Sequence, residues 1–280
     1  MTTSELPCRL PRLVAIGGLD PTGGAGLVRD FLTARSLGAA VRLIPTAWTE
    51  QSPADGVRHI EPRPAAALME SIRDAVRVDP RDAVAAMAVK IGMLPDDATA
   101  AAVREGLQGF VGPVVLDPVL AASSGGALFA GDLEALVALA GRATVMTPNS
   151  QEAAILTGLP VRTIEEAAAV GVALRGRGVK AVLIKGGHLS PTTAPYLDGP
   201  APSSVDLVAD TLVDATGVRV FRSPRLYGPP VRGTGCALAT AIAVGLARGL
   251  TLELAVIEAR RWLIAALALP VAVDGEWHLP

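Results

Sequence analysis

The sequence has 280 residues, half of them hydrophobic, which is enough to form one large buried core. Its 25 Lys and Arg residues nearly balance its 27 Asp and Glu residues, and the formal net charge is -2. This balance gives no electrostatic reason to expect nucleic acid or an anionic membrane as a partner, and we expect neither.

The cysteines and the apolar runs indicate the compartment. Two cysteines, Cys8 and Cys236, are too few for a disulfide framework and are not paired as zinc ligands would be. Residues 1–11 lack the order of a signal peptide and are expected to be a flexible N-terminus. The longest apolar runs, near 237–247 and 262–273, are too short or too interrupted for a membrane span of about 20 residues. We therefore predict a soluble cytoplasmic protein.

Short apolar runs alternate with longer alanine-rich stretches of helical spacing. This alternation predicts an α/β fold in a single domain, 1–280, with mainly parallel strands and helical crossovers. In such a sheet, ligands bind beyond the carboxyl ends of the strands. Residues 206–227 contain β-branched runs that predict a hairpin or edge strands, and residues 190–204 predict a surface loop. The predicted strands are 13–16, 88–91, 114–116, 143–146 and 181–184, and the predicted helices are 27–36, 64–76, 98–107, 133–140, 164–175 and 237–247.

A glycine-rich segment, residues 17–26, follows the first predicted strand and precedes a predicted helix. Closely spaced glycines let the backbone approach a ligand and leave amide groups free at a helix start. A dinucleotide fingerprint beginning at Gly24 would need glycine or alanine where Arg29 stands, and no G-K-[ST] of a P-loop occurs. The segment therefore indicates another kind of ligand-binding loop, with a structural turn as the alternative.

A second glycine motif, residues 232–236 (Arg-Gly-Thr-Gly-Cys), precedes a predicted helix of small residues. The backbone amides of Gly233, Thr234 and Gly235 would form an anion hole for the charge on a transferring phosphoryl group. Cys236 would lie at the mouth of this hole, where the helix dipole and the adjacent Arg232 favour the thiolate. We take these four residues, Gly233 to Cys236, as candidate catalytic residues, with Cys236 as base or polar neighbour. The alternative is a small buried cysteine after two turn glycines.

Single polar residues follow three of the predicted strands: Asp117, Asn149 with Glu152, and Lys185. Carboxylates at such ends can hold Mg²⁺ through water, and a lysine can meet phosphate as a point charge. The alternative for Asn149 and Glu152 is a structural role, because residues 147–152 form a good helix start. Lysine is scarce in this chain, which makes a phosphate-binding role for Lys185 more plausible.

Taken in order, these segments resemble the hydroxymethylpyrimidine/phosphomethylpyrimidine kinase family of the ribokinase-like superfamily. No single segment is decisive, but six in family order across residues 13–267 are specific. The segments are Gly-Leu-Asp-Pro-Thr-Gly-Gly-Ala-Gly (18–26) with Asp30, Lys-Ile-Gly-Met-Leu (90–94), Val-Leu-Asp-Pro-Val (115–119), Thr-Pro-Asn (147–149) with Glu152, Lys-Gly-Gly-His (185–188) and Gly-Thr-Gly-Cys (233–236).

The resemblance implies a three-layer α/β/α sandwich and phosphoryl transfer from ATP, with Mg²⁺, to hydroxymethylpyrimidine or its monophosphate in thiamine biosynthesis. By matching position, Asp117 and Glu152 would serve the metal, and Lys185 and Asn149 would bind ATP. We also expect a homodimer. The residues that would line the pyrimidine site are Gly18, Ala25, Asp30, Gln51, Met93 and Val119.

Four residues depart from the family pattern: Leu19, Glu50, Ser123 and Arg232. We expect Glu50 to add a charge beside Gln51. The missing cation at Ser123 would weaken binding of a phosphorylated substrate, and Arg232 would restore a cation nearby. Two alternatives therefore stay open: a kinase for pyridoxal-type vitamers, and a ligand-binding paralogue that transfers phosphate poorly.

Overall fold

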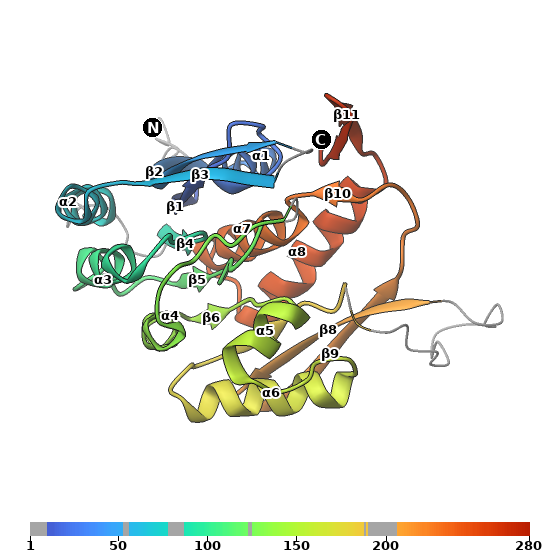
Figure 1. The fold of residues 1–280 in the computed structure, drawn as a ribbon. Coiled ribbons are helices and arrows are strands. Elements are labelled where there is room, and N and C mark those ends of the chain that lie inside the picture. The colour runs from blue at the N-terminus through green and yellow to red at the C-terminus, as the bar shows by residue number, and fades with distance from the viewer. Residues whose placement is uncertain (1–9, 53–55, 78–86, 123–124, 188, 190–205) are drawn as a thin grey trace, which may run out of the picture.

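The computed structural model describes residues 10–52, 56–77, 87–122, 125–187, 189 and 206–280. The described residues form a fold built on a nine-stranded sheet (Figure 1). From one edge to the other its strands are β3 (Gly56–Pro62), β2 (Ala40–Ser52), β1 (Arg12–Leu19), β4 (Met87–Ile91), β5 (Val114–Leu116), β6 (Val145–Met146), β7 (Val182–Ile184), β8 (Leu207–Asp214) and β9 (Gly217–Pro224).

The centre of the sheet is parallel and its edges are antiparallel. The six strands from β2 to β7 pair in parallel, whereas β3 pairs antiparallel with β2, and β8 pairs antiparallel with both β7 and β9. The mainly parallel sheet predicted from the sequence is thereby confirmed. The predicted hairpin at 206–227 is confirmed as well, because β8 and β9 pair continuously up to Asp214 and Gly217.

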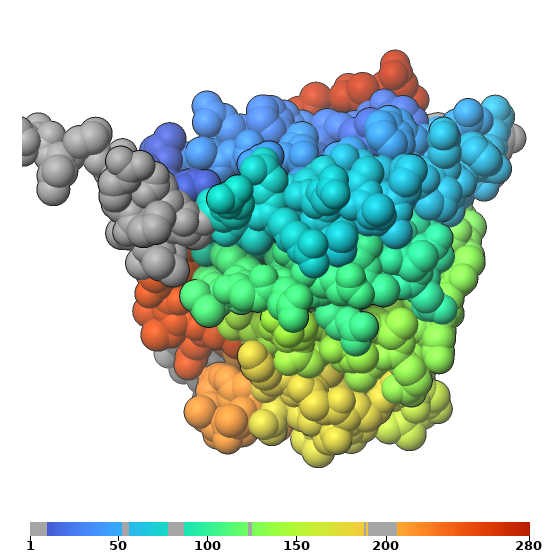
Figure 2. Space-filling model, turned by 90° about the vertical axis from the view of Figure 1, so that its left-hand side faces the viewer, coloured from blue at the N-terminus to red at the C-terminus, as the bar shows by residue number. Residues whose placement is uncertain are grey.

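Helices cover both faces of the sheet. Residues of β1 alternate between the two hydrophobic clusters: Val14 and Ile16 belong to one, and Leu13 and Ala15 to the other. In Figure 2 the helices of the first face form successive bands that follow the strand order. On that face lie α2 (Ala65–Val76), α3 (Asp97–Gly106), α4 (Leu133–Ala140), α5 (Ser150–Thr157) and α6 (Ile164–Gly176), and on the other α1 (Gly26–Ser36), α7 (Thr234–Ala247) and α8 (Leu252–Leu267). The predicted three-layer α/β/α sandwich is confirmed.

Five of the eight described helices carry a side-chain cap, and α1, α2 and α7 do not. Asp96 accepts a hydrogen bond from the Thr99 amide at the start of α3, and Thr251 accepts one from the Leu254 amide at the start of α8. These contacts satisfy amide groups that a helix leaves unpaired in its first turn. Helix α7 differs, because its N-cap residue is Gly233 and no side chain caps it. The first amide groups of α7 are therefore available to a hydrogen-bond acceptor other than a capping side chain.

A small second sheet lies beside the amino end of α7. It consists of β10 (Val231–Arg232), β12 (Glu276–His278) and β11 (Val271–Val273), in that order. The sequence patterns did not predict this sheet, nor β2, β3 and α8. Of the predicted segments, residues 1–9 and 190–204 lie outside the described part of the chain. Among the helices of the described part, none is long and apolar enough to cross a membrane.

The contact between α6 and β8 predicts opposite effects for two glycines of one helix. A Cβ at Gly171 would lie 2.5 Å from Val213 Cγ2, whereas a Cβ at Gly176 would meet nothing within 4 Å. We expect Gly171→Ala to lower the free energy of unfolding by about 1–3 kcal/mol through overpacking. Gly176→Ala should raise it by about 0.5 kcal/mol, since alanine has less backbone entropy to lose. Urea unfolding measures both, and a stable Gly171→Ala variant would contradict this close packing.

Candidate active site

One cavity of about 710 Å³ opens at the carboxyl ends of the parallel strands. The structure places every residue predicted for the site on its lining. These are Gly18, Ala25, Asp30, Gln51, Met93, Asp117, Val119, Asn149, Glu152, Lys185, Gly233, Thr234, Gly235 and Cys236.

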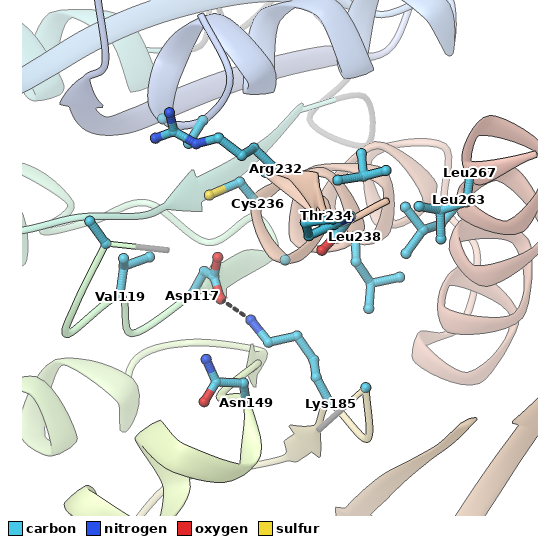
Figure 3. A pocket seen from close by; sticks show the side chains of 18 of the residues that line it. Asp117, Val119, Asn149, Lys185, Arg232, Thr234, Cys236, Leu238, Leu263 and Leu267 are labelled. Atoms are coloured by element: carbon cyan, nitrogen blue, oxygen red, sulfur yellow. Dashed lines mark hydrogen bonds and ion pairs between the residues drawn. The ribbon is translucent and has the colours of Figure 1, made fainter. Parts of the chain in front are cut away.

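The cavity has two ends with the amino end of α7 between them. Figure 3 shows Val119 on one side of the Asp117–Lys185 pair and the apolar side chains of α7 and α8 on the other. The second end was not predicted from the sequence. The apolar run near 262–273 could have indicated this apolar end, but from the sequence it was considered only as a possible membrane span. Its apolar lining includes Leu238, Leu263, Ile264 and Leu267.

Close backbone contact explains the glycine at the start of α7. Gly233 has a φ of 74°, in the left-handed region, and a Cβ there would lie 2.2 Å from the carbonyl oxygen of Gly24. Only glycine fits such a position. The glycine-rich loop after β1 and the turn before α7 therefore pack directly on each other, which brings two segments far apart in sequence to one side of the cavity.

Lys185 faces the first turn of α7. A Cβ at Gly235 would lie 3.1 Å from Lys185 Nζ, so the ammonium group and the uncapped amides border the same space. Lys185 Nζ also donates a hydrogen bond of 2.6 Å to Asp117 and lies 4.0 Å from Glu152. Burial lowers the pKa of Lys185, but the two carboxylates outweigh it and the pKa is raised. The lysine is therefore a lasting positive charge at the centre of the cavity.

Asn149 and Glu152 form a capping box at the start of α5. The Asn149 side chain accepts a hydrogen bond of 2.8 Å from the Glu152 amide, and the Glu152 carboxylate accepts one of 2.7 Å from the Asn149 amide. Both residues thus have the structural role that the sequence left open. Burial raises the pKa of Glu152 to about 6, although Lys185 opposes the shift. No group of three or more His, Cys, Asp or Glu side chains suited to a metal occurs among the described residues.

Asp30 lies at the buried bottom of the cavity, where its carboxylate is already used. Lys90 Nζ donates to both carboxylate oxygens at 2.9 and 2.8 Å, and the Thr240 hydroxyl donates to one of them at 2.8 Å. Burial lowers the pKa of Lys90, but Asp30 outweighs it and raises the pKa overall. Asp30 therefore holds Lys90, a lining residue that the sequence motifs did not single out, and its contact with a ligand stays a prediction.

The expected thiolate at Cys236 is wrong in this structure. Burial raises the pKa of the Cys236 thiol to about 11, and the opposing effect of Lys90 and Lys185 does not overcome it. Arg232 does not supply the expected help, because its guanidinium group pairs with Asp20 and Glu276. A thiol with this pKa is protonated at neutral pH.

Comparison with known proteins shows the family of this chain. The profile of the family described as phosphomethylpyrimidine kinase matches residues 20–280. The chain belongs to this family. A hydroxymethylpyrimidine/phosphomethylpyrimidine kinase of Salmonella typhimurium is 38% identical over 261 residues, which cover 91% of this chain and 90% of the relative. One of Streptomyces coelicolor is 34% identical and covers 98% of this chain and 95% of the relative.

Solved structures show the same fold. A phosphomethylpyrimidine kinase of Clostridium difficile superposes with a TM-score of 0.71 at 28% identity, over 92% of this chain and all (100%) of the other. A pyridoxal kinase of Staphylococcus aureus, in complex with AMP-PCP and pyridoxal, gives a TM-score of 0.78 at 24% identity, over 97% of this chain and 93% of the other. The family and the ribokinase-like fold inferred from the sequence are confirmed.

Three of the four departures from the family pattern can now be placed. Glu50 is exposed and pairs across the strands with His59, so it does not add a charge to the cavity as expected. Side chains alternate up to this point of β2, so Thr49 is buried and Glu50 is exposed, and the pairing with β3 then shifts register before Gln51, which lines the cavity. Leu19 packs against the hydrophobic cluster around α1 and α7. Arg232 pairs with Asp20 and Glu276, and Ser123 lies outside the described residues.

The raised pKa predicts an unreactive cysteine. Because the thiolate fraction falls tenfold for each pH unit below the pKa, iodoacetamide should alkylate Cys236 about two orders of magnitude more slowly than free cysteine at pH 7.5. The rate should rise tenfold per pH unit up to pH 10. Peptide mapping by mass spectrometry separates Cys236 from Cys8. A rate profile with an apparent pKa below 8.5 would show that the thiol is activated after all.

Proposed function

We propose that this protein transfers the γ-phosphoryl group of ATP to hydroxymethylpyrimidine, to its monophosphate, or to both, in thiamine biosynthesis. The observation that carries the proposal is the position of Lys185 against the uncapped start of α7, in the middle of a cavity with two distinct ends. Family membership supports the same reaction. We further propose a homodimer, which would cover exposed apolar side chains such as Leu43 and Trp48 of β2.

The amino end of α7 would stabilise the transferring group. Phosphoryl transfer requires mostly positioning and stabilisation of charge on the phosphoryl oxygens. The amides of Thr234, Gly235 and Cys236 lie at the positive end of a 14-residue helix and have no side-chain cap. Lys185 adds a full charge to these partial charges. Together they form a preorganised anion hole that needs no rearrangement when the transition state forms.

The two ends of the cavity suit two different ligands. The apolar end between α7 and α8 would hold the base of ATP, while the phosphates would reach back to Lys185 and Asn149. The opposite end, which includes Gly18, Ala25 and Val119, would hold the pyrimidine ring, with Gln51 as its polar contact and Met93 packing beside it. With the ligands bound in this way, the acceptor hydroxyl would lie near Cys236.

Cys236 would act as a protonated neighbour of the acceptor hydroxyl. Its pKa of about 11 leaves almost no thiolate at neutral pH. Because the transition state of phosphoryl transfer is loose, a strong base is not required. A thiol can accept or donate a weak hydrogen bond, which is enough to orient the hydroxyl. We therefore favour the polar-neighbour alternative over the base.

The donor set fits a magnesium ion that is held mainly by water and phosphate. Asp117 and Glu152 supply two buried carboxylates on either side of Lys185. Mg²⁺ is commonly bound by one or two carboxylates together with water and substrate phosphates. When bound, it would neutralise phosphate charge and help to orient the leaving group. The raised pKa of Glu152 agrees with a carboxylate that gains from a nearby cation.

The decisive experiment supplies Mg·ATP with single acceptors: hydroxymethylpyrimidine, its monophosphate and pyridoxine. Mass spectrometry of the product and a coupled measurement of ADP give the reaction. The proposal expects product from at least one pyrimidine at a higher kcat/KM than from pyridoxine. Preference for pyridoxine would support a vitamer kinase, and binding of a pyrimidine without turnover would support a ligand-binding paralogue. Either outcome would overturn the proposal.

Gly235→Ala tests the anion hole. Unlike Gly233, this residue does not have a positive φ, and the new Cβ would approach only the end of the Lys185 side chain. Alanine keeps the backbone amide, but its Cβ would lie 3.1 Å from Lys185 Nζ and would displace the ammonium group from the start of α7. We therefore expect kcat to fall about 10²-fold, the size of losing one preorganised donor, while KM for the pyrimidine changes little. Steady-state kinetics measure both, with Gly176→Ala as the folded control. A kcat within a few-fold of the unsubstituted enzyme would show that the position of Lys185 against this turn does not matter for turnover.

Glu152→Gln tests the metal assignment. The amide keeps the acceptor oxygen for the Asn149 amide, so helix α5 should remain capped. With one negative charge removed, about tenfold more Mg²⁺ should be needed for half-maximal rate. Titration of Mg²⁺ at fixed ATP measures this, and calorimetric binding of the pyrimidine without ATP should be unchanged. Full activity of the unsubstituted enzyme in excess chelator would refute a metal role.

A further inference from the structure

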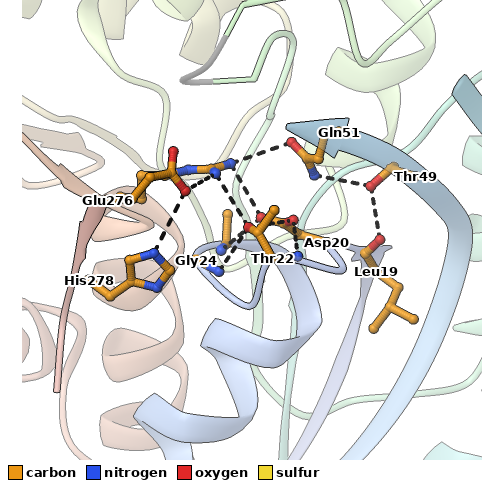
Figure 4. A network of polar contacts seen from close by, with 10 residues as sticks. Leu19, Asp20, Thr22, Gly24, Thr49, Gln51, Glu276 and His278 are labelled. Carbon is orange, nitrogen blue, oxygen red and sulfur yellow. Dashed lines mark hydrogen bonds and ion pairs between the residues drawn. The ribbon is translucent and has the colours of Figure 1, made fainter. Parts of the chain in front are cut away.

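A chain of hydrogen bonds joins the C-terminal strand β12 to Gln51, the polar residue of the proposed ring site. The Arg232 guanidinium group contacts both Glu276 of β12 and the side chain of Gln51, two residues that Figure 4 labels. Arg232 Nη1 donates to Glu276 at 2.7 Å, and Arg232 Nη2 donates to Gln51 Oε1 at 3.5 Å. On its other side, Gln51 Nε2 donates to the Thr49 hydroxyl oxygen at 3.0 Å.

The chemistry of these neighbours fixes which way the Gln51 amide faces. Thr49 uses its one hydroxyl hydrogen on the Leu19 carbonyl oxygen, at 2.9 Å. Its oxygen can then only accept, so it requires an N–H group of Gln51. Arg232 can only donate, so it requires the Gln51 oxygen. Reversing the amide would therefore break both contacts, and the orientation found leaves one N–H and one lone pair of Gln51 for a ligand.

Arg232 is held by two carboxylates and is not a free cation. Besides Glu276, it contacts Asp20 at 3.4 Å and the Thr22 hydroxyl at 3.3 Å, and its side chain is only 9% exposed. Asp20 in turn accepts the amides of Thr22 and Ala25 at 2.9 and 3.1 Å, which orders the glycine-rich loop. The expectation that Arg232 replaces a missing cation for a substrate phosphate is therefore not supported, because its charge is already balanced.

The C-terminal segment is fixed against the site by further contacts. His278 Nε2 lies 3.7 Å from the Glu276 carboxylate, and Arg29 donates to the carbonyl oxygen of Pro280 at 3.4 Å. A Cβ at Gly24 would lie 3.1 Å from His278 Cε1, so β12 packs directly on the glycine-rich loop. Glu276 is thus presented to Arg232 by a strand that is itself anchored.

We propose that Arg232, held by Glu276, is a positioning residue that sets the donor and acceptor directions of Gln51 and thereby the choice of acceptor ring. A ring that carries a nitrogen acceptor next to an exocyclic amine complements the free N–H and lone pair of Gln51. A pyridine alcohol has no such neighbouring pair. The inference rests on the proposed function, since it assumes that Gln51 meets the acceptor ring.

The kinetic test compares Arg232→His and Glu276→Ala with a surface control. Both should raise KM for the aminopyrimidine alcohol about fivefold, the effect of weakening one neutral hydrogen bond, and leave kcat nearly unchanged. KM for pyridoxine should not change, so the preference between the two acceptors should fall. The control variants Arg162→His and Glu166→Ala remove an exposed ion pair and should leave the preference unchanged. An unchanged preference in Arg232→His and Glu276→Ala would overturn the proposal.

A second measurement needs no turnover, and so separates this inference from the proposed function. The sequence has three glutamines and one asparagine, namely Gln51, Gln108, Gln151 and Asn149, which give four pairs of side-chain amide signals in a ¹⁵N–¹H spectrum. Loss of one pair in Gln51→Leu assigns the Gln51 signal. That signal should shift in Arg232→His and Glu276→Ala, but not in the two surface controls. A Gln51 signal that stays in place in both variants would refute the positioning role, even if the kinase reaction is confirmed.

Discussion

The site depends on the burial of helix α7. Every residue from Ala237 to Ala247 is buried, and the helix packs against α1, α8 and the central strands of the sheet. A helix enclosed in this way cannot rotate or shift to satisfy its own first amides. Because Gly233 sits against the Gly24 carbonyl, no side chain has room to cap them. The uncapped amide groups cost free energy, and the packing of the buried part of α7 offsets this cost. The amide donors of the first turn are therefore held in fixed positions that face the cavity.

The charged side chains around the first turn of α7 are paired in a way that allows an anion to bind and be released. Lys185 would gain from a phosphate, yet without one it remains buried and needs a partner. Asp117 supplies this partner at 2.6 Å, with Glu152 at 4.0 Å. A bound nucleotide with Mg²⁺ would let the lysine turn to phosphate while the metal takes over the carboxylates. The same three side chains can therefore serve the empty and the occupied site without leaving a buried charge unpaired.

Local patterns predicted the parts of the fold that are buried on both faces. The predicted runs of β1, β5 and β7 are continuously apolar and that of β4 is interrupted only by the buried Lys90, and residues that line the cavity follow each of them. Strands β2 and β3 were missed because β2 contains Pro45 and exposed residues such as Leu43 and Trp48, and its outer half pairs with β3 alone. The thiol of Cys236 was misjudged for a different reason. A motif shows that a helix starts there, but it does not show how much water the fold removes from around the half-buried thiol, and this desolvation raises its pKa more than the nearby cations lower it.

Arg232 shows why a departure from a family pattern has to be interpreted together with its surroundings. Its immediate sequence suggests a cation beside the anion hole, and only the fold brings Glu276 and Asp20 to it from segments far away in the chain. A buried guanidinium group is tolerated only where carboxylates compensate the loss of water. The arginine at this position and the acid in β12 therefore depend on each other, and β12 supports the cavity through Arg232, which is itself a lining residue. Variation in this C-terminal segment would then reach the cavity by two routes, because Glu276 holds Arg232 and Leu279 packs with Ala237 of α7.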